Sequence, residues 1–299
     1  MNNGLSGVDH ALIGVRDLER ARAGFERLGF TATRRGHHAG WGTANHCLMF
    51  PDDYVELIGV VDPAAFTGGL DGFLAESGEG LLGLALRTDD PEATRAAWRD
   101  AGLAPSEVKD LGRLIDSGEG GEVELRFRNV MLEPEATAGL RVFACAHLTP
   151  EPMRRPEWLA HPNGALGIGS ITVVAAEPEA LAPTLAKVFG VASLTETDDT
   201  LAVHTGRGVI LVTTPDDFHL IHPELEAIDD EPGDARPRLA ALTLVVEDAD
   251  RTAAYLDERG VPFRRQHGGT IGIAPEQAHG VRLEFAPAVA FPRRAGAAG

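Results

Sequence analysis

The chain has 299 residues, 43% of them hydrophobic, and a formal net charge of −18. This length predicts about two soluble domains of roughly 150 residues each, and the acidic excess argues against nucleic acid or an anionic membrane as a partner. No apolar stretch reaches the roughly 18 residues of a membrane span, no secretory leader is visible, and the two cysteines form no CxxC motif. We therefore expect a cytoplasmic protein.

Four segments along the chain repeat one pattern: an apolar strand, an acidic or proline-marked turn, an amphipathic helix with a glycine at its end, and then further short strands. The four strand-helix segments span residues 11–30, 84–103, 171–191 and 242–261. In the first helix Ala21, Phe25 and Leu28 have the spacing of one buried face. Because one such unit cannot enclose a core by itself, we predict an α+β fold in which four βαβββ modules pair into two domains.

The proline-rich stretch in the middle of the chain marks the domain boundary. We predict a first domain at 1–147 with modules 8–62 and 81–147, a junction at 148–165, a second domain at 166–290 with modules 168–214 and 239–287, and a disordered tail at 291–299.

Two residues are each the one ionisable side chain in the middle of an apolar, alternating segment of the first module. His10 lies in the segment 8–15 and Glu56 in the segment 53–60. Burying a charge costs several kcal/mol unless the charge is paired or coordinated. An imidazole and a carboxylate on neighbouring strands therefore indicate either metal ligands or a buried hydrogen-bonded pair.

Repeated βαβββ modules with a histidine on a first strand and a glutamate on a last strand resemble the vicinal oxygen chelate superfamily. More narrowly, residues 8–21, 36–45, 53–60 and 145–165 resemble its glyoxalase-like domain family, of the glyoxalase, bleomycin resistance and dioxygenase type. The resemblance implies a cup with a divalent metal ion that chelates a substrate through two adjacent oxygens. Because the superfamily contains lyases, isomerases, dioxygenases and binding proteins, the resemblance does not select one activity.

By this resemblance the metal ligands of the first domain are His10 and Glu56. Module two departs from the pattern, because Gly83 and Phe143 stand at the aligned positions. His147 lies four residues beyond Phe143 and so faces the same side of a strand. It either completes a two-histidine, one-carboxylate site suited to Fe, Mn, Co, Ni or Zn, or forms a hydrogen bond in the junction.

The second domain has fewer of the residues that this chemistry needs. Glu284 matches Glu56, but Ser170 and Ala241 occupy the first-strand histidine positions. We therefore predict that the second domain is a degenerate copy and that the first holds the active cup.

Polar and aromatic residues gather in the glycine-rich segment that precedes Glu56. His38 is predicted to be the general acid or base, because an imidazole titrates near neutral pH. In the junction, a guanidinium could bind a substrate carboxylate, with a purely linking role as the alternative. The predicted substrate-binding residues are Trp41, Asn45, His46 and Arg155.

Our first hypothesis is a metal-dependent lyase or isomerase that acts on a small oxygen-rich metabolite. The alternatives are an Fe(II)-dependent dioxygenase on the same scaffold and a non-enzymatic binding or sequestration protein, which the altered module-two positions favour. The expected partner is a small-molecule substrate, with no nucleic acid and no membrane, and the chain is expected to be a monomer or a homodimer.

Overall fold

The computed structural model describes residues 3–116, 118, 120–197, 200–226, 228, 236–265 and 269–290. The predicted tail at 291–299 lies outside these residues. None of the helices within them is both long enough and apolar enough to cross a bilayer.

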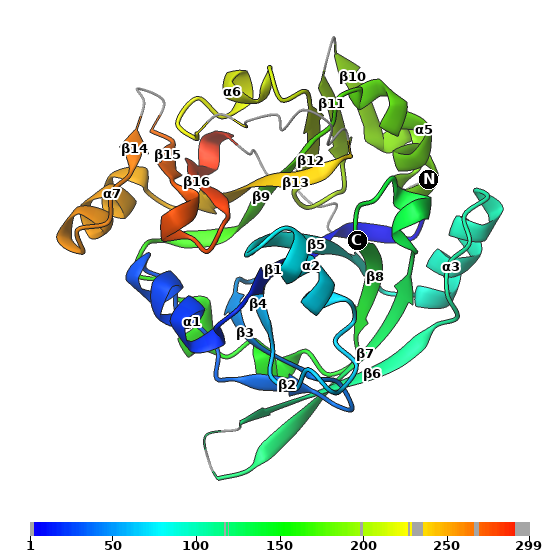
Figure 1. Ribbon diagram of the computed structural model, residues 1–299, viewed down its shortest axis with the longest axis horizontal. Helices are drawn as coiled ribbons and strands as arrows, with labels where there is room; N and C mark the ends of the chain where they lie inside the picture. Colours follow the sequence, from blue (N-terminus) through cyan, green and yellow to red (C-terminus); the bar gives the residue numbers. More distant parts are fainter. Residues whose placement is uncertain are drawn as a thin grey trace, which may run out of the picture.

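The first eight strands close into a barrel in the order β1-β4-β3-β2-β6-β7-β8-β5, in the lower half of Figure 1. They are β1 (Leu5–Val15), β2 (Gly36–His38), β3 (Thr43–Met49), β4 (Tyr54–Val60), β5 (Gly80–Thr88), β6 (Lys109–Asp116), β7 (Glu122–Met131) and β8 (Val142–His147). Helix α1 (Leu18–Arg27) follows β1, α2 (Leu70–Glu76) precedes β5 and α3 (Pro91–Asp100) follows it. The β1–β5 and β2–β6 pairs join two modules of four strands into one closed sheet.

The second eight strands form an open sheet in the order β10-β11-β12-β9-β13-β16-β15-β14. They are β9 (Ala165–Val174), β10 (Leu194–Thr197), β11 (Thr200–His204), β12 (Val209–Thr213), β13 (Arg238–Val246), β14 (Arg264–Arg265), β15 (Ile271–Ile273) and β16 (Arg282–Pro287). The remaining α-helices are α4 (Pro156–Leu159) in the junction, α5 (Pro178–Phe189), α6 (Phe218–Ile221) and α7 (Ala249–Glu258). Five short 3-10 turns are η1 (Pro134–Thr137), η2 (Glu151–Met153), η3 (Val191–Ser193), η4 (Pro275–Gln277) and η5 (Ala288–Ala290). Each module reads β-α-β-β-β, and the predicted fold class is confirmed.

Three of the four helices that follow a module's first strand begin at an aspartate cap, as their sequences predict, whereas Glu177 at the start of α5 makes no side-chain cap hydrogen bond. The carboxylate of Asp17 accepts hydrogen bonds from the backbone N–H groups of Glu19 and Arg20 at the start of α1. These bonds satisfy donors that the helix itself cannot pair. Helix α1 then buries Leu18, Ala21 and Phe25, so the apolar stripe holds this helix against the outside of the barrel.

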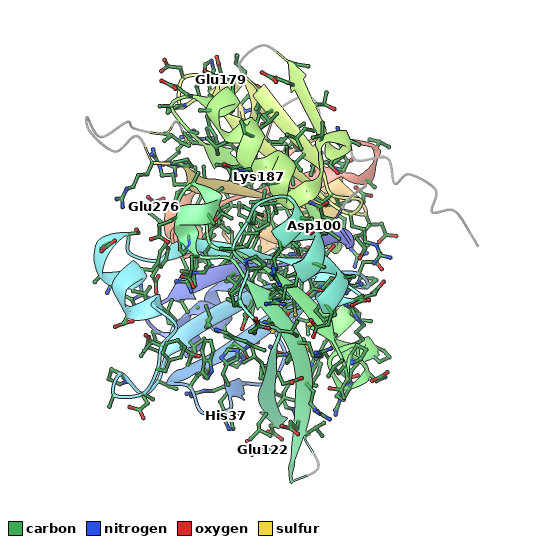
Figure 2. All side chains as sticks on the ribbon, turned by 90° about the vertical axis from the view of Figure 1, so that its right-hand side faces the viewer. His37, Asp100, Glu122, Glu179, Lys187 and Glu276 are labelled. Carbon is green, nitrogen blue, oxygen red and sulfur yellow. The ribbon has the colours of Figure 1, made fainter. Side chains whose placement is uncertain are left out.

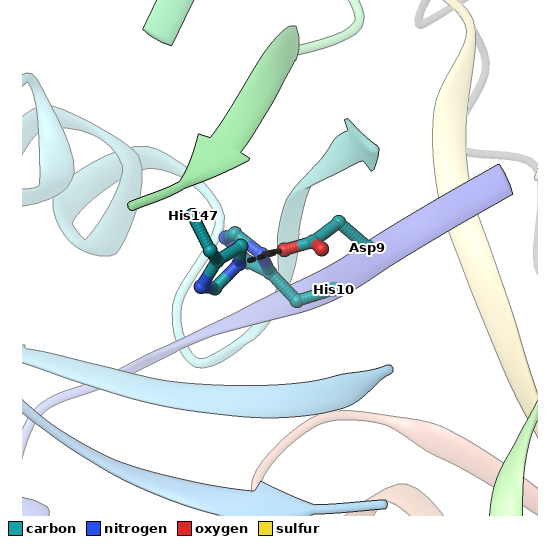
Figure 3. Close-up of side chains that lie close together, drawn as sticks. All are labelled: Asp9, His10 and His147. Carbon is teal, nitrogen blue, oxygen red and sulfur yellow. Dashed lines mark hydrogen bonds and ion pairs between the residues drawn. The ribbon is translucent and has the colours of Figure 1, made fainter. Parts of the chain in front are cut away.

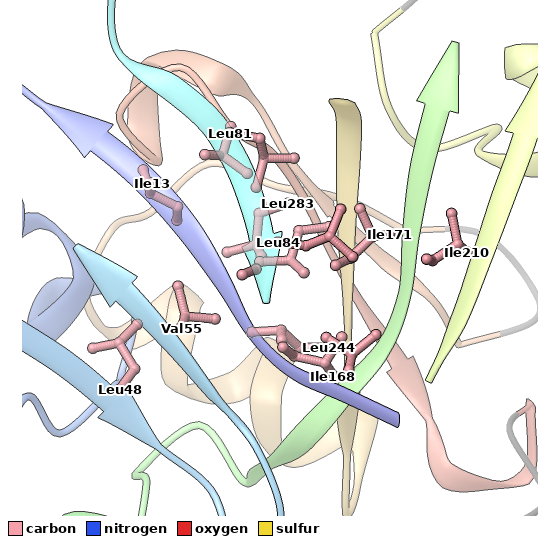
Figure 4. Packing of buried hydrophobic residues seen from close by; sticks show 14 of the residues in the cluster. Ile13, Leu48, Val55, Leu81, Leu84, Ile168, Ile171, Ile210, Leu244 and Leu283 are labelled. Carbon is pink, nitrogen blue, oxygen red and sulfur yellow. The ribbon is translucent and has the colours of Figure 1, made fainter. Parts of the chain in front are cut away.

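One hydrophobic core joins the barrel to the second sheet. Its buried side chains come from both parts of the chain, and Figure 4 shows Leu84 of the barrel close to Leu283 and Ile171 of the second sheet. The backbone N–H of Val8 also donates to the carbonyl of Arg207 at 2.9 Å. The outer face of β1 and β5 is therefore buried, and the inner face remains for a site.

The junction closes one end of the barrel. Met153 and Trp158 of the junction pack in one buried cluster with Cys47, Met49 and Tyr54, which face the barrel interior. At the same end the β6–β7 ribbon extends away from the second sheet, with Glu122 near its tip and His37 beside it (Figure 2), and His37 Nδ1 lies 3.6 Å from Glu122 Oε1.

A buried carboxyl group connects the two sheets. Asp53 is 6% exposed, and its Oδ1 accepts a hydrogen bond from the backbone N–H of Ile168 at 3.0 Å. Burial raises the pKa of Asp53 to about 7, although the Ile168 hydrogen bond opposes this change. The folded protein therefore holds the Asp53 proton more tightly than the unfolded chain does, and this carboxyl lowers stability as pH rises from about 4 to about 7.

We expect Asp53→Asn to remove this pH dependence while its amide oxygen keeps the hydrogen bond. The free energy of unfolding of the variant relative to wild type should rise by about 2–3 kcal/mol between pH 5 and pH 8. Urea denaturation at both pH values measures this difference. The contribution of histidine titration is the same in both proteins, so it cancels when the two free energies of unfolding are subtracted. An equal difference at the two pH values would show that Asp53 titrates normally.

Candidate functional site

The barrel encloses a cavity of about 410 Å³. Tyr54, which belongs to the buried cluster with Met153 and Trp158, lines this cavity. Its walls come from every second residue of the strands, as expected for side chains that alternate between faces. On β4, for example, Tyr54, Glu56 and Ile58 line it. Its polar residues include His10, His38, Glu56, Arg113 and Asn129, and the rest of the lining is largely apolar.

Asp9 and His10 are neighbours in sequence, yet their side chains meet. On β1, Val8 pairs with Leu86 and His10 with Ala85, so Asp9 is an extra residue in a bulge. His10 Nδ1 donates to Asp9 Oδ2 at 2.8 Å, and His147 Nε2 donates to the same oxygen at 2.8 Å (Figure 3). Arg87 Nε donates to Asp9 Oδ1 at 3.1 Å. Three donors therefore satisfy a carboxylate that is 0% exposed.

These partners determine the charge of Asp9. Burial raises the pKa of Asp9, but the charges and hydrogen bonds of His147 and His10 outweigh it and hold this pKa well below its usual range. An ionised carboxylate can only accept hydrogen bonds. The proton of a neutral His10 therefore lies on Nδ1, and Nε2 carries a lone pair that faces the cavity side.

Glu56 faces that lone pair. His10 Nε2 lies 3.6 Å from Glu56 Oε2, and both side chains are buried. Burial raises the pKa of Glu56, but His38, His10 and Arg113 together hold it well below its usual range. Tyr54 stacks on the His10 ring with centroids 4.3 Å apart, which further fixes the ring. The lone pair of His10 and the carboxylate of Glu56 therefore face each other. A cation or a proton between them would stabilise this arrangement.

His38 and Asn45 surround the other oxygen of Glu56. Asn45 Nδ2 donates to Glu56 Oε1 at 2.5 Å, and His38 Nε2 lies 3.4 Å from the same oxygen. His38 Nδ1 lies 2.8 Å from Thr43 Oγ1. His38 lines the cavity, whereas Asn45 does not. Asn45 thus contacts the carboxylate, and His38 is the imidazole with access to a bound molecule.

The predicted metal ligands are not gathered as one set. Within the described part of the chain, the one group of three His, Cys, Asp or Glu residues whose ligand atoms lie within 4.8 Å of one another is Asp9, His10 and His147. Glu56 is outside it, because Glu56 faces Nε2 of His10 while Asp9 and His147 lie on the Nδ1 side. His147 is also absent from the cavity lining.

Of the predicted substrate-binding residues, Trp41 is the one that lines the cavity. Trp41 lines the cavity beside Phe66, with ring centroids 4.7 Å apart. His46 lies on the opposite face of β3 from Asn45, where its ring contacts the Thr33 carbonyl and Glu19. Because side chains alternate along a strand, one of these two neighbours had to face away from the cavity.

Arg155 also lies outside the cavity lining. Its guanidinium stacks over the Trp158 ring at 5.1 Å, which supports the linking alternative for this part of the junction. We therefore leave Arg155 and His46 out of the site proposed below.

In module two, the positions that align with His10 and Glu56 are Gly83 and Phe143, which offer no metal ligand. Since Gly83 aligns with His10, Ala85 aligns with Leu12. Ala85 pairs with Phe143 across β5 and β8 just as Leu12 pairs with Glu56 across β1 and β4, so Phe143 is the counterpart of Glu56. At Gly83, even a Cβ would lie 2.8 Å from the Arg141 carbonyl oxygen. A histidine could not replace Gly83 without displacing that backbone.

In the second domain the chain itself fills the corresponding place. His222, which follows α6, lies 3.1 Å from Glu284 Oε2 through Nδ1 and 2.7 Å from Thr172 Oγ1 through Nε2. Thr243 also donates to Glu284, at 3.0 Å. These bonds satisfy Glu284 internally, in contrast to Glu56, which faces the cavity.

Two residues that shape the site were not predicted. Asp9 was missed because strict alternation assigns it to the face opposite His10, and no sequence signal marks the bulge. Arg113 is 2% exposed and lines the cavity. Its signal was available, since it interrupts the alternation of Leu111 and Ile115 in a strand whose other inward residues are mostly apolar.

The model of the glyoxalase-like domain family matches residues 8–189. The chain belongs to this family. The predicted resemblance is thereby confirmed, and the family is part of the vicinal oxygen chelate superfamily, whose members are mostly metal-dependent enzymes. A sequence search of curated proteins gave no match.

Solved structures share the glyoxalase-like fold at low identity. A hypothetical protein from Staphylococcus aureus has a TM-score of 0.63 and 12% identity, with 94% of this chain and 98% of that chain covered. A mutant of 4-hydroxymandelate synthase from Streptomyces coelicolor has a TM-score of 0.57 and 15% identity, with 96% and 93% covered. A fusion of a xylose isomerase-like TIM barrel with 4-hydroxyphenylpyruvate dioxygenase has a TM-score of 0.58 and 16% identity, and this chain spans 51% of its length. At these identities the likeness establishes the fold alone.

Replacing one of the two acceptor oxygens of Asp9, together with its charge, should lower the stability of the fold. In Asp9→Asn the amide cannot accept from three donors, so we expect the free energy of unfolding to fall by about 3–5 kcal/mol. Glu19→Gln is the matched control, because Glu19 also contacts a histidine but is 55% exposed, and its loss should change stability by about 1 kcal/mol or less. Urea denaturation compares the two, and equal losses would refute the role given to Asp9.

Proposed function

We propose that this glyoxalase-like protein is a metal-dependent lyase or isomerase that moves a proton on a small substrate with two adjacent oxygens, bound in the first-domain cavity. The observation that carries the proposal is the cavity-side pair of His10 Nε2 and Glu56 Oε2, 3.6 Å apart and buried. An imidazole and a carboxylate are suitable ligands for Mn, Fe, Co, Ni or Zn.

The surroundings of the pair fit a divalent ion. Ligand atoms that share an ion at about 2.1 Å lie about 3.0–3.4 Å apart for bond angles between square and tetrahedral, and the observed 3.6 Å requires only a small adjustment. The carboxylate of Asp9 orients His10 through Nδ1, as carboxylates commonly orient metal-bound histidines. With these two residues as protein ligands, positions stay open for water and substrate.

A bound ion would polarise the substrate oxygens and stabilise negative charge that develops when a neighbouring C–H bond ionises. His38 is the proposed base, since its Nε2 lies at the cavity wall and next to Glu56. It would accept the proton and return it, and Glu56 would stabilise the imidazolium form. Asn45 holds Glu56 in place, and Trp41 with Phe66 covers the cavity from the side of residues 62–69.

A binding or sequestration protein is the second candidate. It is favoured by Gly83 and Phe143, which leave module two without the ligands that the superfamily pattern implies. An Fe(II)-dependent dioxygenase would use the same pair and differs in its oxygen requirement.

Deuterium exchange tests proton transfer without knowledge of the natural substrate. Metal-loaded protein is incubated in D₂O with a panel of small 2-hydroxy ketones and 2-oxo acids, and NMR records deuterium next to the carbonyl. We expect exchange on at least one compound, loss of exchange with a chelator, and a decrease of about 10²–10⁴-fold in His38→Ala. Glu284→Gln, the same change at the second-domain counterpart, should leave the rate unaltered.

The outcomes separate the candidates. Tight binding of panel compounds without exchange or metal dependence would favour the binding protein, and oxygen uptake that requires Fe(II) would favour the dioxygenase. Exchange that is undiminished in His38→Ala would contradict the role proposed for that residue.

A further inference from the structure

Arg113 is a buried cation whose partners do not match its charge. It lies on β6, is 2% exposed and lines the cavity. Its Nη1 donates to Cys47 Sγ at 3.1 Å and its Nη2 to Met153 Sδ at 3.0 Å, while the Phe127 ring centroid lies 5.7 Å from Cζ. Thiol and thioether sulfurs are weak acceptors. These contacts position the guanidinium without neutralising it.

One nitrogen of Arg113 has no partner. Nε is buried and forms no hydrogen bond, and within the described ranges no carboxylate pairs with this guanidinium. Glu56 does interact with it electrostatically, but Glu56 Oε1 accepts from Asn45 and Oε2 faces His10. Arginine is almost never fully buried without a partner, because the loss of hydration is so unfavourable. An anion at the closed end of the cavity would supply the missing partner.

The lining of the cavity indicates which kind of anion fits. Phe127 packs against an apolar cluster that includes Leu12, Ile58 and Phe143, and all four residues line the cavity. The lining also includes the charged residues Lys109, Glu133 and Arg141. Only two of the five guanidinium N–H groups donate to sulfur, and the buried Nε–H has no hydrogen-bond partner. A planar carboxylate can accept from two N–H groups of one guanidinium, and apolar walls favour a carboxylate on an apolar body over the strongly hydrated inorganic phosphate. The chain as a whole carries a charge of −18, so its general composition does not account for a buried unpaired cation at this place.

We propose that Arg113 is a specificity-determining residue that binds the carboxylate of a substrate whose body is apolar. This inference rests on the proposed function only in that both use the same cavity. The charge of Arg113 would offset the repulsion between the incoming carboxylate and Glu56, and would orient the rest of the molecule along the apolar wall toward His38 and His10.

Binding of simple probes to metal-free, full-length protein tests the inference separately from turnover. Isothermal titration calorimetry would compare phenylacetate with phenylacetamide, which has the same shape without the charge, and with inorganic phosphate. We expect phenylacetate to bind at least about tenfold more tightly than either. In Arg113→Met this preference should disappear, and in Arg113→Lys, which keeps the charge, part of it should return.

Controls keep the result interpretable. Arg113→Met removes a buried charge beside Cys47 and Met153, so it is expected to fold, and circular dichroism with thermal unfolding verifies this. Arg128→Met makes the same change on a strand surface, where Arg128 pairs with Glu92, and should keep the preference. In wild type, phenylacetate should also shift the Arg113 Nε–H resonance in ¹H–¹⁵N spectra.

Three results would overturn the inference. They are equal or absent binding of acid and amide, tighter binding of phosphate, and a preference for the acid that persists in Arg113→Met or depends instead on the cavity residue Arg141. If exchange activity fails but the Arg113-dependent preference is found, the proposed reaction is wrong and the carboxylate site stands.

Discussion

The hydrogen bond between Asp9 and His10 is the interaction on which the first-domain site depends. It exists because a bulge in β1 gives Asp9 no partner on β5 and lets adjacent side chains meet. Since Asp9 accepts from His10 Nδ1, the Nε2 lone pair is directed to Glu56. Without the bulge, alternation would place Asp9 on the far face of β1 and leave the tautomer of His10 undetermined.

The barrel makes this local arrangement effective. The junction residues Met153 and Trp158 close one end, and the second sheet covers the outer face of β1 and β5. Asp9, His10 and Glu56 are therefore buried, so their charges act on one another more strongly than they would at the surface. In the second domain, by contrast, His222 and Thr243 satisfy Glu284. The two halves of the protein thus differ: Glu56 faces a cavity, whereas Glu284 is hydrogen-bonded to residues of the chain itself.

Much of the fold could be predicted, because it follows from periodic patterns. The repeated pattern of strand, capped helix and further strands predicts the modules, and the apolar stripe of Ala21, Phe25 and Leu28 predicts the buried face of the first helix, where all three side chains are buried. The pair of His10 and Glu56 could be found because charged residues in apolar strands need partners. Alternation alone could not find Asp9, since a bulge breaks the two-residue period. It could have shown that Asn45 and His46 face opposite sides, and tertiary packing alone decided that Arg155 stacks on Trp158. The ligand set and the domain boundaries stay predictions.

The central claim is that a divalent ion binds on the Nε2 side of His10. Anomalous diffraction from crystals soaked in Mn²⁺ or Co²⁺ tests it most directly, because the metal is located by its own scattering. We expect a peak within bonding distance of His10 Nε2 and a Glu56 oxygen, with the Asp9 hydrogen bond to Nδ1 retained. A peak among Asp9, His10 and His147, or no peak in this domain, would contradict the claim.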